Sequence, residues 1–534
     1  MAAVADLIIA SLRGAGVHTL FGLPGGGSNL DLIAAAGRAD LPFVLTSTET
    51  AAALAAIAQA EITGRPGACL TTLGPGVTSV VNGVACAFLD RAPLVVFTDS
   101  HSVAADGAFE HQRLDQAALM RPITKSSAAV TAENAARVVA CAIRTASAYP
   151  PGPVHLECPG DVASAHLVSA PAMGDHATAP VEAGAAPSVP DFLAGARRPL
   201  LLVGLGARRS DDAVAIRSLC ERRHLPAMVT YKAKGVVPDG HEWFGGVFTN
   251  ATIEQAVVED SDVIIGIGLD PVELLPRRWK HDQPIVYVGP WTVEDRHVPF
   301  AAQIVTDIVA GTDQLVAALS VSDWDSTRLR QQVSEQRRHV SIPAGPLAAH
   351  RVVEIAAAQL ASREGRVTVD AGAHMLPATM LWPVSEPNHL LISNGLSTMG
   401  FAVPAAIGAA LVDRSRPVAA LTGDGGLLMC LGELSTAVRL RLRIIVIVFS
   451  DASLSLIEIK QQARRFQPAG VSLGVIDWPA LAAGFGATAW VASDEAELER
   501  AIGQSLACDG PTLIEARIDR SNYGATLRAV RGHV

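Results

Sequence analysis

Short apolar runs alternate with longer stretches rich in alanine and leucine along most of the chain. The runs, among them PLLLVGLG, DVIIGIG and RIIVIVFSD, are continuous segments of Val, Ile and Leu. Continuous apolar strands that are separated by helices indicate parallel strands buried on both faces of a sheet. Because the pattern recurs in three successive blocks, we predict an α/β protein with three doubly wound parallel-sheet domains.

Two stretches of different composition separate the three blocks. Residues 169–190 are rich in Ala, Pro and Gly, whereas residues 320–346 are polar, and we predict that both are linkers. The domains are therefore expected at 1–168, 190–320 and 346–525. A chain of 534 residues is long enough to supply several separate hydrophobic cores.

Composition and charge narrow the classes of function. The seven cysteines include no CxxC pair, which fits reduced thiols and not a disulfide framework or a zinc site. A formal net charge of −10 with dispersed Lys and Arg gives no basic stripe for nucleic acid. The N-terminal segment MAAVADLIIASLRGAGV has the apolar stripe of an amphipathic helix, and no uninterrupted apolar run is long enough to span a membrane. We therefore expect a cytoplasmic protein with neither a nucleic acid nor a membrane as partner.

Two apolar runs of the third block each stop at an aspartate. VAALTG leads to Asp424, RIIVIVFS leads to Asp451, and the segment LLMCLGELSTAVRL between them is predicted to be one helix. A right-handed crossover would place the carboxyl ends of the two strands side by side, at the edge where open α/β sheets bind ligands. Gly423, Gly425 and Gly426 allow close backbone approach and lead into a helix N-terminus, which favours an anion.

Carboxylates beside a bound phosphate would repel it unless a hard cation lay between them. Magnesium held by one or two carboxylates and by phosphate oxygens is the usual solution. A strand-to-helix turn with an aspartate cap would explain GDG on its own. The second aspartate, at the end of the next strand, favours the alternative, and we predict a magnesium–diphosphate site.

The segment GDGGLLMCLGELSTAVRLRLRIIVIVFSD resembles the cofactor motif of the thiamine diphosphate enzymes, in which GDG is followed at a distance by Asn or Asp. This family includes acetolactate synthase, benzaldehyde lyase, oxalyl-CoA decarboxylase and benzoylformate decarboxylase. Nearly the whole chain shares the resemblance. FGLPGGG, TETAAALAAIAQAEITGRPG and TTLGPGVTSVVNGVACAFLDRAPLVVFT look like the family's pyrimidine-binding domain, RRPLLLVGLGA like its central domain, and NGLSTMGFAVPAAIGAAL like the approach to its diphosphate-binding domain.

The resemblance implies thiamine diphosphate and Mg²⁺ as cofactors and a role for each matching residue. Asp424 and Asp451 would bind Mg²⁺ through their side chains, and Ser453 through its backbone carbonyl. The full set of implied cofactor-binding residues is Pro75 near the pyrimidine, Ala373 and His374 at the diphosphate, Ser397 and Met399 at the aminopyrimidine, and Gly423, Asp424, Gly425, Gly426, Asp451 and Ser453 in the GDG motif and at its end.

Glu49 aligns with the family's catalytic glutamate, whose protonated carboxyl hydrogen-bonds a ring nitrogen of the aminopyrimidine. The surrounding AAALAAIA is apolar and is expected to raise the pKa of such a carboxyl. A glutamate that opens a helix also offsets the helix dipole, which is the simpler explanation. Its distance from GPG matches the family, and we prefer the catalytic role.

The residues that handle the substrate are less defined. AFEHQRLDQ aligns with the segment that gives several relatives an active-site glutamine, and the register leaves either His111 or Gln112 in that role. Lys460 stands where acetolactate synthases carry a tryptophan, and Arg209 replaces the third glycine of a GxGxxG motif. These departures argue against both acetolactate synthesis and bound FAD.

The function that the resemblance implies is cleavage or formation of a carbon–carbon bond next to a carbonyl. The enzyme would be a lyase or transferase, that is, a decarboxylase, a 2-hydroxy ketone lyase or a carboligase, and would act on a 2-oxo acid or a 2-hydroxy ketone. The family implies a homodimer or homotetramer with the cofactor between subunits. The alternatives are an oxidase with FAD in the central domain and a cofactor-binding paralogue without catalysis.

Overall fold

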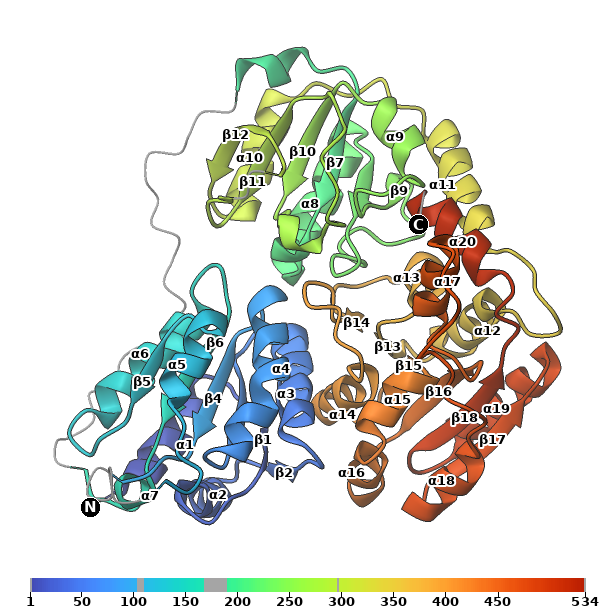
Figure 1. The fold of residues 1–534 in the computed structure, drawn as a ribbon. Coiled ribbons are helices and arrows are strands. Elements are labelled where there is room, and N and C mark those ends of the chain that lie inside the picture. The colour runs from blue at the N-terminus through green and yellow to red at the C-terminus, as the bar shows by residue number, and fades with distance from the viewer. Residues whose placement is uncertain (1, 103–109, 168–189, 295–296, 533–534) are drawn as a thin grey trace.

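The computed structural model describes residues 2–102, 110–167, 190–294 and 297–532, and within them the chain forms three six-stranded sheets (Figure 1). Every pairing between neighbouring strands of these sheets is parallel. Helices cover both faces of each sheet. The predicted fold class, three doubly wound α/β domains, is confirmed.

The first sheet has the strand order β2-β1-β3-β4-β6-β5. Its strands are β1 (Leu20–Leu23), β2 (Phe43–Leu45), β3 (Gly67–Thr71), β4 (Leu94–Thr98), β5 (Ser127–Ala129) and β6 (Pro153–Glu157). The helices around it are α1 (Val4–Gly14), α2 (Ser28–Arg38), α3 (Glu49–Thr63), α4 (Pro75–Leu89), α5 (Gln116–Met120), η2 (Arg121–Ile123), α6 (Ala135–Ser147) and α7 (Gly160–Ala163). The predicted amphipathic N-terminal helix is α1, whose apolar stripe is buried.

The second sheet has the order β12-β11-β10-β7-β8-β9. Its strands are β7 (Pro199–Val203), β8 (Ala227–Val229), β9 (Phe244–Val247), β10 (Val263–Ile267), β11 (Ile285–Gly289) and β12 (Phe300–Val305). Its helices are η3 (Asp191–Gly195), η4 (Leu205–Ala207), α8 (Ser210–Arg223), α9 (Gln255–Glu259), η5 (Pro271–Glu273) and α10 (Ile308–Ala318). All of β7, β10 and β11 is buried, as continuous apolar strands require.

The structure differs from the prediction that residues 320–346 are a linker, because most of them form helix α11 (Ser326–Val340). Asp325 caps this helix by accepting the N–H of Thr327. Leu329 packs in the core of the second domain and Val340 in that of the third. The helix is otherwise polar, which concealed it in the sequence. The other predicted linker, residues 169–190, lies outside the described residues except for its last position, and the domain boundaries stay predictions.

The third sheet has the order β14-β13-β15-β16-β18-β17. Its strands are β13 (Arg366–Val369), β14 (Leu390–Ile392), β15 (Val418–Gly423), β16 (Ile444–Ser450), β17 (Thr488–Ala492) and β18 (Thr512–Arg517). Its helices are α12 (Ala349–Ala361), α13 (Met375–Leu381), α14 (Ala402–Val412), α15 (Asp424–Cys430), α16 (Glu433–Arg439), α17 (Ser455–Ala463), α18 (Trp478–Phe485), α19 (Glu495–Ala507) and α20 (Tyr523–Arg531).

The prediction of a single helix between β15 and β16 is wrong, because the chain forms α15 and α16 with a break at Gly432. At this break the backbone lies against the first domain. A Cβ on Gly432 would lie 3.0 Å from the Cβ of Ser47, a tight contact that glycine avoids.

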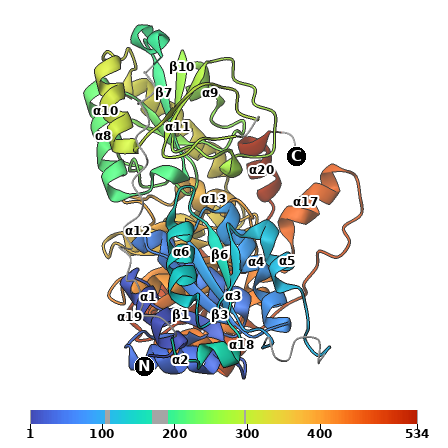
Figure 2. The ribbon, with the colours of Figure 1, turned by 90° about the vertical axis from the view of Figure 1, so that its left-hand side faces the viewer.

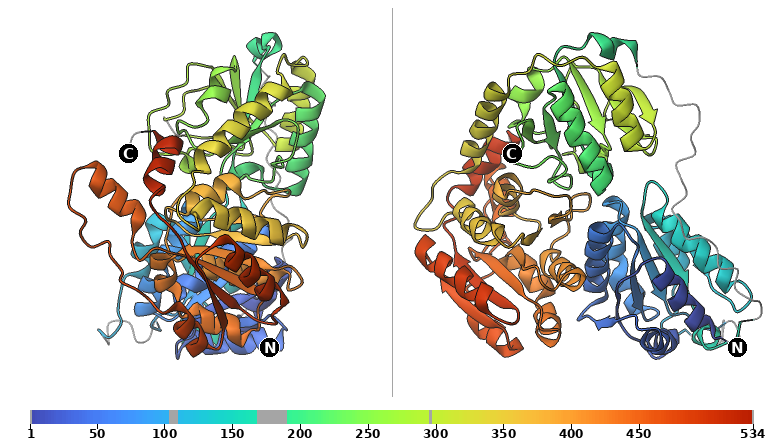
Figure 3. Two further views of the ribbon diagram at one scale, coloured as in Figure 1. Left: turned by 90° about the vertical axis from the view of Figure 1, so that its right-hand side faces the viewer. Right: turned by 180° about the vertical axis from the view of Figure 1, so that it is seen from behind.

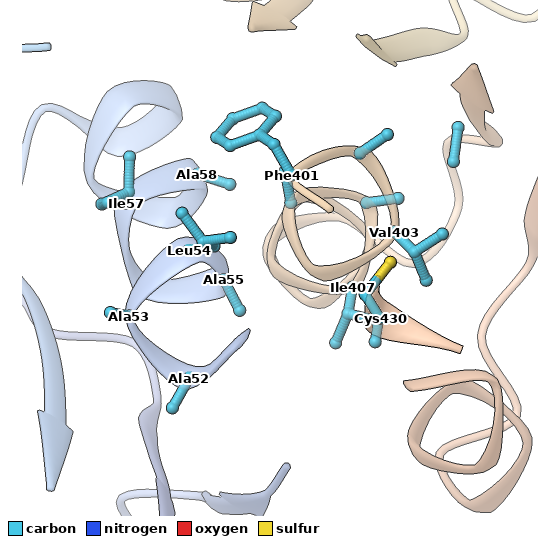
Figure 4. Close-up of a cluster of buried hydrophobic side chains, with 14 of the residues drawn as sticks. Ala52, Ala53, Leu54, Ala55, Ile57, Ala58, Phe401, Val403, Ile407 and Cys430 are labelled. Carbon is cyan, nitrogen blue, oxygen red and sulfur yellow. The ribbon is translucent and has the colours of Figure 1, made fainter. Parts of the chain in front are cut away.

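Helices α3 and α14 join the first and third domains. The side chains of Leu54, Ala55 and Ala58 point from α3 toward α14 (Figure 4). A Cβ on Gly408 would lie 2.2 Å from the carbonyl oxygen of Ala55, and the amide of Gln59 donates to the carbonyl of Gly408. One continuous apolar core therefore spans both domains.

The second domain lies across the other two, as the right-hand view of Figure 3 shows from behind. Helix α17 and the chain after it stand out from the body of the molecule (Figure 2). Among the helices of the described residues, none is both long and apolar enough to cross a membrane.

Candidate functional site

The ends of β15 and β16 bring the two predicted metal-binding aspartates together. The strands pair in parallel with Gly423 opposite Phe449, and Asp424 directly follows the first of them. Asp451 directly follows the second. This arrangement is the one that a right-handed crossover between adjacent parallel strands produces.

Hydrogen bonds fix the carboxylate of Asp424. Its Oδ2 accepts the backbone N–H groups of Asp451 and Ala452, each at 2.8 Å. Its Oδ1 accepts the indole N–H of Trp478 at 3.1 Å. Trp478 is fully buried, and the sequence did not reveal its role because it lies on α18, after β16 and α17.

The carboxylate of Asp451 is held next to that of Asp424. It accepts the backbone N–H of Ser453 and the hydroxyl of Ser455. Burial and then the charge of Asp424 raise the pKa of Asp451 to about 6. Within the described part of the chain, no three His, Cys, Asp or Glu side chains cluster as a metal site. A metal held by these two carboxylates would therefore also need carbonyl or phosphate oxygens, which suits Mg²⁺.

The two glycines that follow Asp424 lie in close contacts at the start of α15. A Cβ on Gly425 would lie 2.5 Å from Cδ2 of Leu454 and 3.1 Å from Cε of Met399. A Cβ on Gly426 would lie 2.4 Å from Oδ2 of Asp370. The structure thus brings Met399, which the sequence pointed to on a separate motif, against the start of α15.

His374 lies beside the same turn. A Cβ on Gly423 would lie 3.4 Å from its ring, which stacks on Phe449 with the ring centroids 5.1 Å apart. Burial lowers the pKa of His374 to about 4, so the imidazole is neutral at physiological pH. Its Nε2 is buried with no hydrogen-bond partner among the described residues. This unpaired nitrogen, the neighbouring buried Ala373 and the close-packed glycines fit a diphosphate group bound at the turn.

The segment that carries Ser397 and Met399 is held on both sides. Ser397 is exposed, has a left-handed φ of 53°, and its hydroxyl donates to the carbonyl of Asn394. From the first domain, the buried carboxylate of Asp90 accepts the N–H groups of Asn394 and Gly395. The sequence did not identify Asp90.

Asp370 holds the other end of that segment. Its carboxylate accepts the N–H groups of Gly400 and Phe401 and the hydroxyl of Thr422. Burial raises the pKa of Asp370 to about 6. It follows β13 directly, so the same rule that pointed to the other two aspartates would have found it.

Glu49 opens α3 in the first domain. Thr48 caps this helix by accepting the N–H of Ala51 at 3.2 Å. The Glu49 side chain is 7% exposed, and its Oε1 lies 3.2 Å from where a Cβ on Gly76 would stand. Because Pro75 is the first residue of α4, the structure brings Glu49 against the GPG turn that contains it.

His111 and Gln112 are both exposed, and the preceding residues 103–109 lie outside the described residues. Gln112 has a φ of 57° and packs on the GPG turn, since a Cβ on Gly74 would lie 2.9 Å from its Cβ. The buried Gln116, which the sequence did not single out, accepts the N–H of Gly74. The assignment of the active-site polar group to His111 or Gln112 stays a prediction.

The candidate residues thus form two groups. One lies around the GPG turn of the first domain and the other around the GDG turn of the third. Family models match the chain in the same three parts. The model of the thiamine pyrophosphate enzyme N-terminal TPP binding domain matches residues 2–119, that of the central domain residues 188–315, and that of the C-terminal TPP binding domain residues 370–516.

The chain is similar over almost its full length to curated enzymes. It is 30% identical over 540 residues to the catabolic acetolactate synthase of Raoultella terrigena, which covers 96% of this chain and 95% of that protein. It is 30% identical over 541 residues to acetolactate synthase of Bacillus subtilis (97% and 93%). It is also 28% identical over 530 residues to a probable 2-ketoarginine decarboxylase of Pseudomonas aeruginosa (96% and 93%).

Proposed function

The chain belongs to the thiamine pyrophosphate enzyme family, and on that basis we propose that it cleaves or forms a carbon–carbon bond next to a carbonyl group. The relatives that it resembles include acetolactate synthases and a probable 2-ketoarginine decarboxylase. The proposed activity is that of a decarboxylase or carboligase, and the proposed substrate is a 2-oxo acid or a 2-hydroxy ketone. When bound, thiamine diphosphate supplies the electron sink for this reaction.

The observation that carries the proposal is the pairing of Asp424 and Asp451 beside the unpaired nitrogen of His374. Asp424, Asp451 and the carbonyl of Ser453 would hold Mg²⁺, whose charge would offset both the burial and the neighbouring Asp424 charge that raise the pKa of Asp451. His374, Ala373 and the backbone of residues 423–426 would hold the diphosphate.

The residues around the GPG turn of the first domain and the segment 397–399 would hold the aminopyrimidine. Glu49 would donate a hydrogen bond from its protonated carboxyl to a ring nitrogen, and its buried place at the start of α3 excludes water from that contact. Pro75 and Met399 would pack on the rings, and the carbonyl of Ser397 would accept an amino hydrogen. His111 or Gln112 would contact the substrate at the rim.

We propose that the cofactor lies between subunits of a homodimer or homotetramer. Leu428 and Met429 on α15 are 42% and 62% exposed, and Met429 lies next to the segment that carries Met399. Apolar side chains of this size beside a candidate site suit burial by a second subunit. The described cysteines are all free, which supports a cytoplasmic location.

The test is Glu49→Gln, with Glu133→Gln on the exposed surface of the same domain as the control. Titration of thiamine diphosphate and Mg²⁺, followed by circular dichroism, measures cofactor binding. Turnover is measured with pyruvate, benzoylformate, benzoin and oxalyl-CoA. We expect Glu49→Gln to bind the cofactor like the wild type and to lose about 10²-fold or more in turnover.

The control variant should keep full turnover. Equal turnover by Glu49→Gln and the wild type would refute the proposed role of Glu49. A purified protein with a flavin absorbance spectrum would instead support the FAD-containing oxidase.

A further inference from the structure

Helix α16 of the third domain forms hydrogen bonds to the backbone of the connection between β2 and α3 in the first domain. Oε1 of Glu433, at the start of α16, accepts the backbone N–H groups of Ser47 at 2.8 Å and Thr48 at 3.2 Å. Arg439, at the other end of α16, donates to the carbonyl of Leu45. The two ends of one short helix therefore fix the backbone of residues 45–48.

This connection determines where Glu49 lies. Thr48 has an extended backbone and is the cap of α3, so its direction sets the first turn of that helix. Glu49 is the next residue, and its carboxyl meets the start of α4 near Gly76. A shift of residues 47 and 48 would move the Glu49 carboxyl with them.

The carboxylate of Glu433 is costly to bury for packing alone. Its side chain is 1% exposed, and its Oε2 has no hydrogen-bond partner among the described residues. Burial raises the pKa of Glu433, while the nearby hydroxyl of Thr436 and then the N–H donors of Ser47 and Thr48 oppose this shift. An apolar side chain of similar volume would pack as well without the desolvation cost. The carboxylate adds hydrogen bonds that an apolar side chain lacks. Because both are accepted from adjacent backbone N–H groups, they fix the orientation of the backbone at Ser47 and Thr48.

We propose that Glu433 is a positioning residue that holds Glu49 in its reactive place through the backbone of Ser47 and Thr48. The inference rests on the catalytic role proposed above for Glu49. Asp424 opens the preceding helix, α15, so the segment α15–α16 ties the candidate metal site of a chain to the candidate catalytic glutamate of the same chain. With the cofactor between subunits, each Glu433 acts on the reaction site that the partner subunit completes.

The chain offers a matched control in the second domain. Glu254 is also fully buried, its Oε1 also accepts two backbone N–H groups, from Thr249 and Ala251, and its Oε2 also has no partner among the described residues. Glu254→Asp thus carries the same structural cost as Glu433→Asp but touches no candidate site residue.

The experiment compares Glu433→Asp, Glu433→Gln and Glu254→Asp in the full-length protein with thiamine diphosphate and Mg²⁺. Exchange of the cofactor C2 proton for deuterium, followed by quenched NMR, reports the action of Glu49 without any substrate. Cofactor affinity and thermal stability are measured in parallel. Glu433→Gln keeps an oxygen where Oε1 stands, whereas Glu433→Asp withdraws it by one methylene group.

We expect Glu433→Asp to bind the cofactor like the wild type and to slow the exchange by about 10²-fold, a loss that a displacement near 1 Å can cause. Glu433→Gln and Glu254→Asp should keep most of the exchange rate. Wild-type exchange in Glu433→Asp, or an equal loss in Glu254→Asp, would overturn the proposal. Glu49→Gln distinguishes failure of the positioning role of Glu433 from failure of the catalytic role of Glu49, because rapid exchange in that variant would refute the role of Glu49 itself.

Discussion

Replacement of Lys232 with methionine would leave buried carboxylates unpaired where the three domains meet. The ammonium of Lys232 lies 2.6 Å from Oε1 of Glu61 and 3.5 Å from Oδ2 of Asp90, and it donates to the carbonyl of Ile392. These three charged side chains are almost completely buried. Burial favours a neutral Glu61, but the charges of Lys232 and Arg208 outweigh it and lower the pKa of Glu61.

The cost follows from what each carboxylate would keep. Without Lys232, Glu61 retains one charged partner among the described residues, Arg208 at 3.2 Å. Asp90 retains the backbone N–H groups of residues 394 and 395 and the thiol of Cys86. Removal of one partner from a buried ion pair costs about 3–5 kcal/mol, and we expect that loss in the free energy of unfolding. The double variant Lys232→Met/Glu61→Gln should recover part of it, because the unpaired charge of Glu61 is gone while that of Asp90 remains.

The assay is urea denaturation followed by tryptophan fluorescence. Lys234→Met is the matched control, since Lys234 is buried too but its partner, Asp239, also pairs with Arg337 at 3.2 Å. The control should therefore lose less stability than Lys232→Met. The reasoning is wrong if Lys232→Met unfolds at the wild-type urea concentration, or if Glu61→Gln brings no recovery.

Three further predictions test other parts of the molecule. Burial raises the pKa of Glu254 from 4.5 to about 7, so the folded state binds this proton more tightly than the unfolded state and loses stability as the pH rises between these values. Glu254→Gln should remove about 3 kcal/mol of that pH dependence from the free energy of unfolding in urea. The same pH dependence in the variant and the wild type would contradict this prediction. Trp478→Phe takes away one of the three N–H donors of Asp424 and should weaken Mn²⁺ binding about tenfold or more, measured by electron paramagnetic resonance, whereas an unchanged affinity would argue against Asp424 as a ligand. Gly408→Ala places a methyl group against the carbonyl of Ala55 and should cost about 1–3 kcal/mol, so a wild-type melting temperature would show that α3 and α14 are not in close contact.

The sequence predicted the parts of the fold that local patterns encode. Continuous apolar strands such as β15 and β16 gave the parallel sheets, and the residues just after them gave Asp424 and Asp451. Strands β5, with the sequence SAA, and β17, with TAWVA, were missed because they are only partly buried, and β5 is also only three residues long. Helix α11 was missed because few of its residues are apolar.

Long-range contacts were beyond the sequence. Glu433 bonds Ser47 across 386 positions of the chain, and no periodicity or motif links such residues. Trp478 donates to Asp424 across 54 positions of the chain, and the pattern of strands does not predict that helix α18 lies beside Asp424. The roles of Ser397 and Met399 came from the family resemblance, whereas the contact of Met399 with the GDG turn came only from the structure.

The close contact between α3 and α14 also bears on how the chain folds while the ribosome makes it. Gln59 and Gly408, which bond across this contact, are 349 positions apart. At a synthesis rate of about 5–20 residues per second, the α3 surface waits roughly 20–70 s for its partner to emerge. During that interval an alanine-rich helix face is open to water and to other nascent chains. The first domain therefore completes its core only after α14 has been synthesised, and until then the α3 face is exposed to contacts that the folded protein excludes.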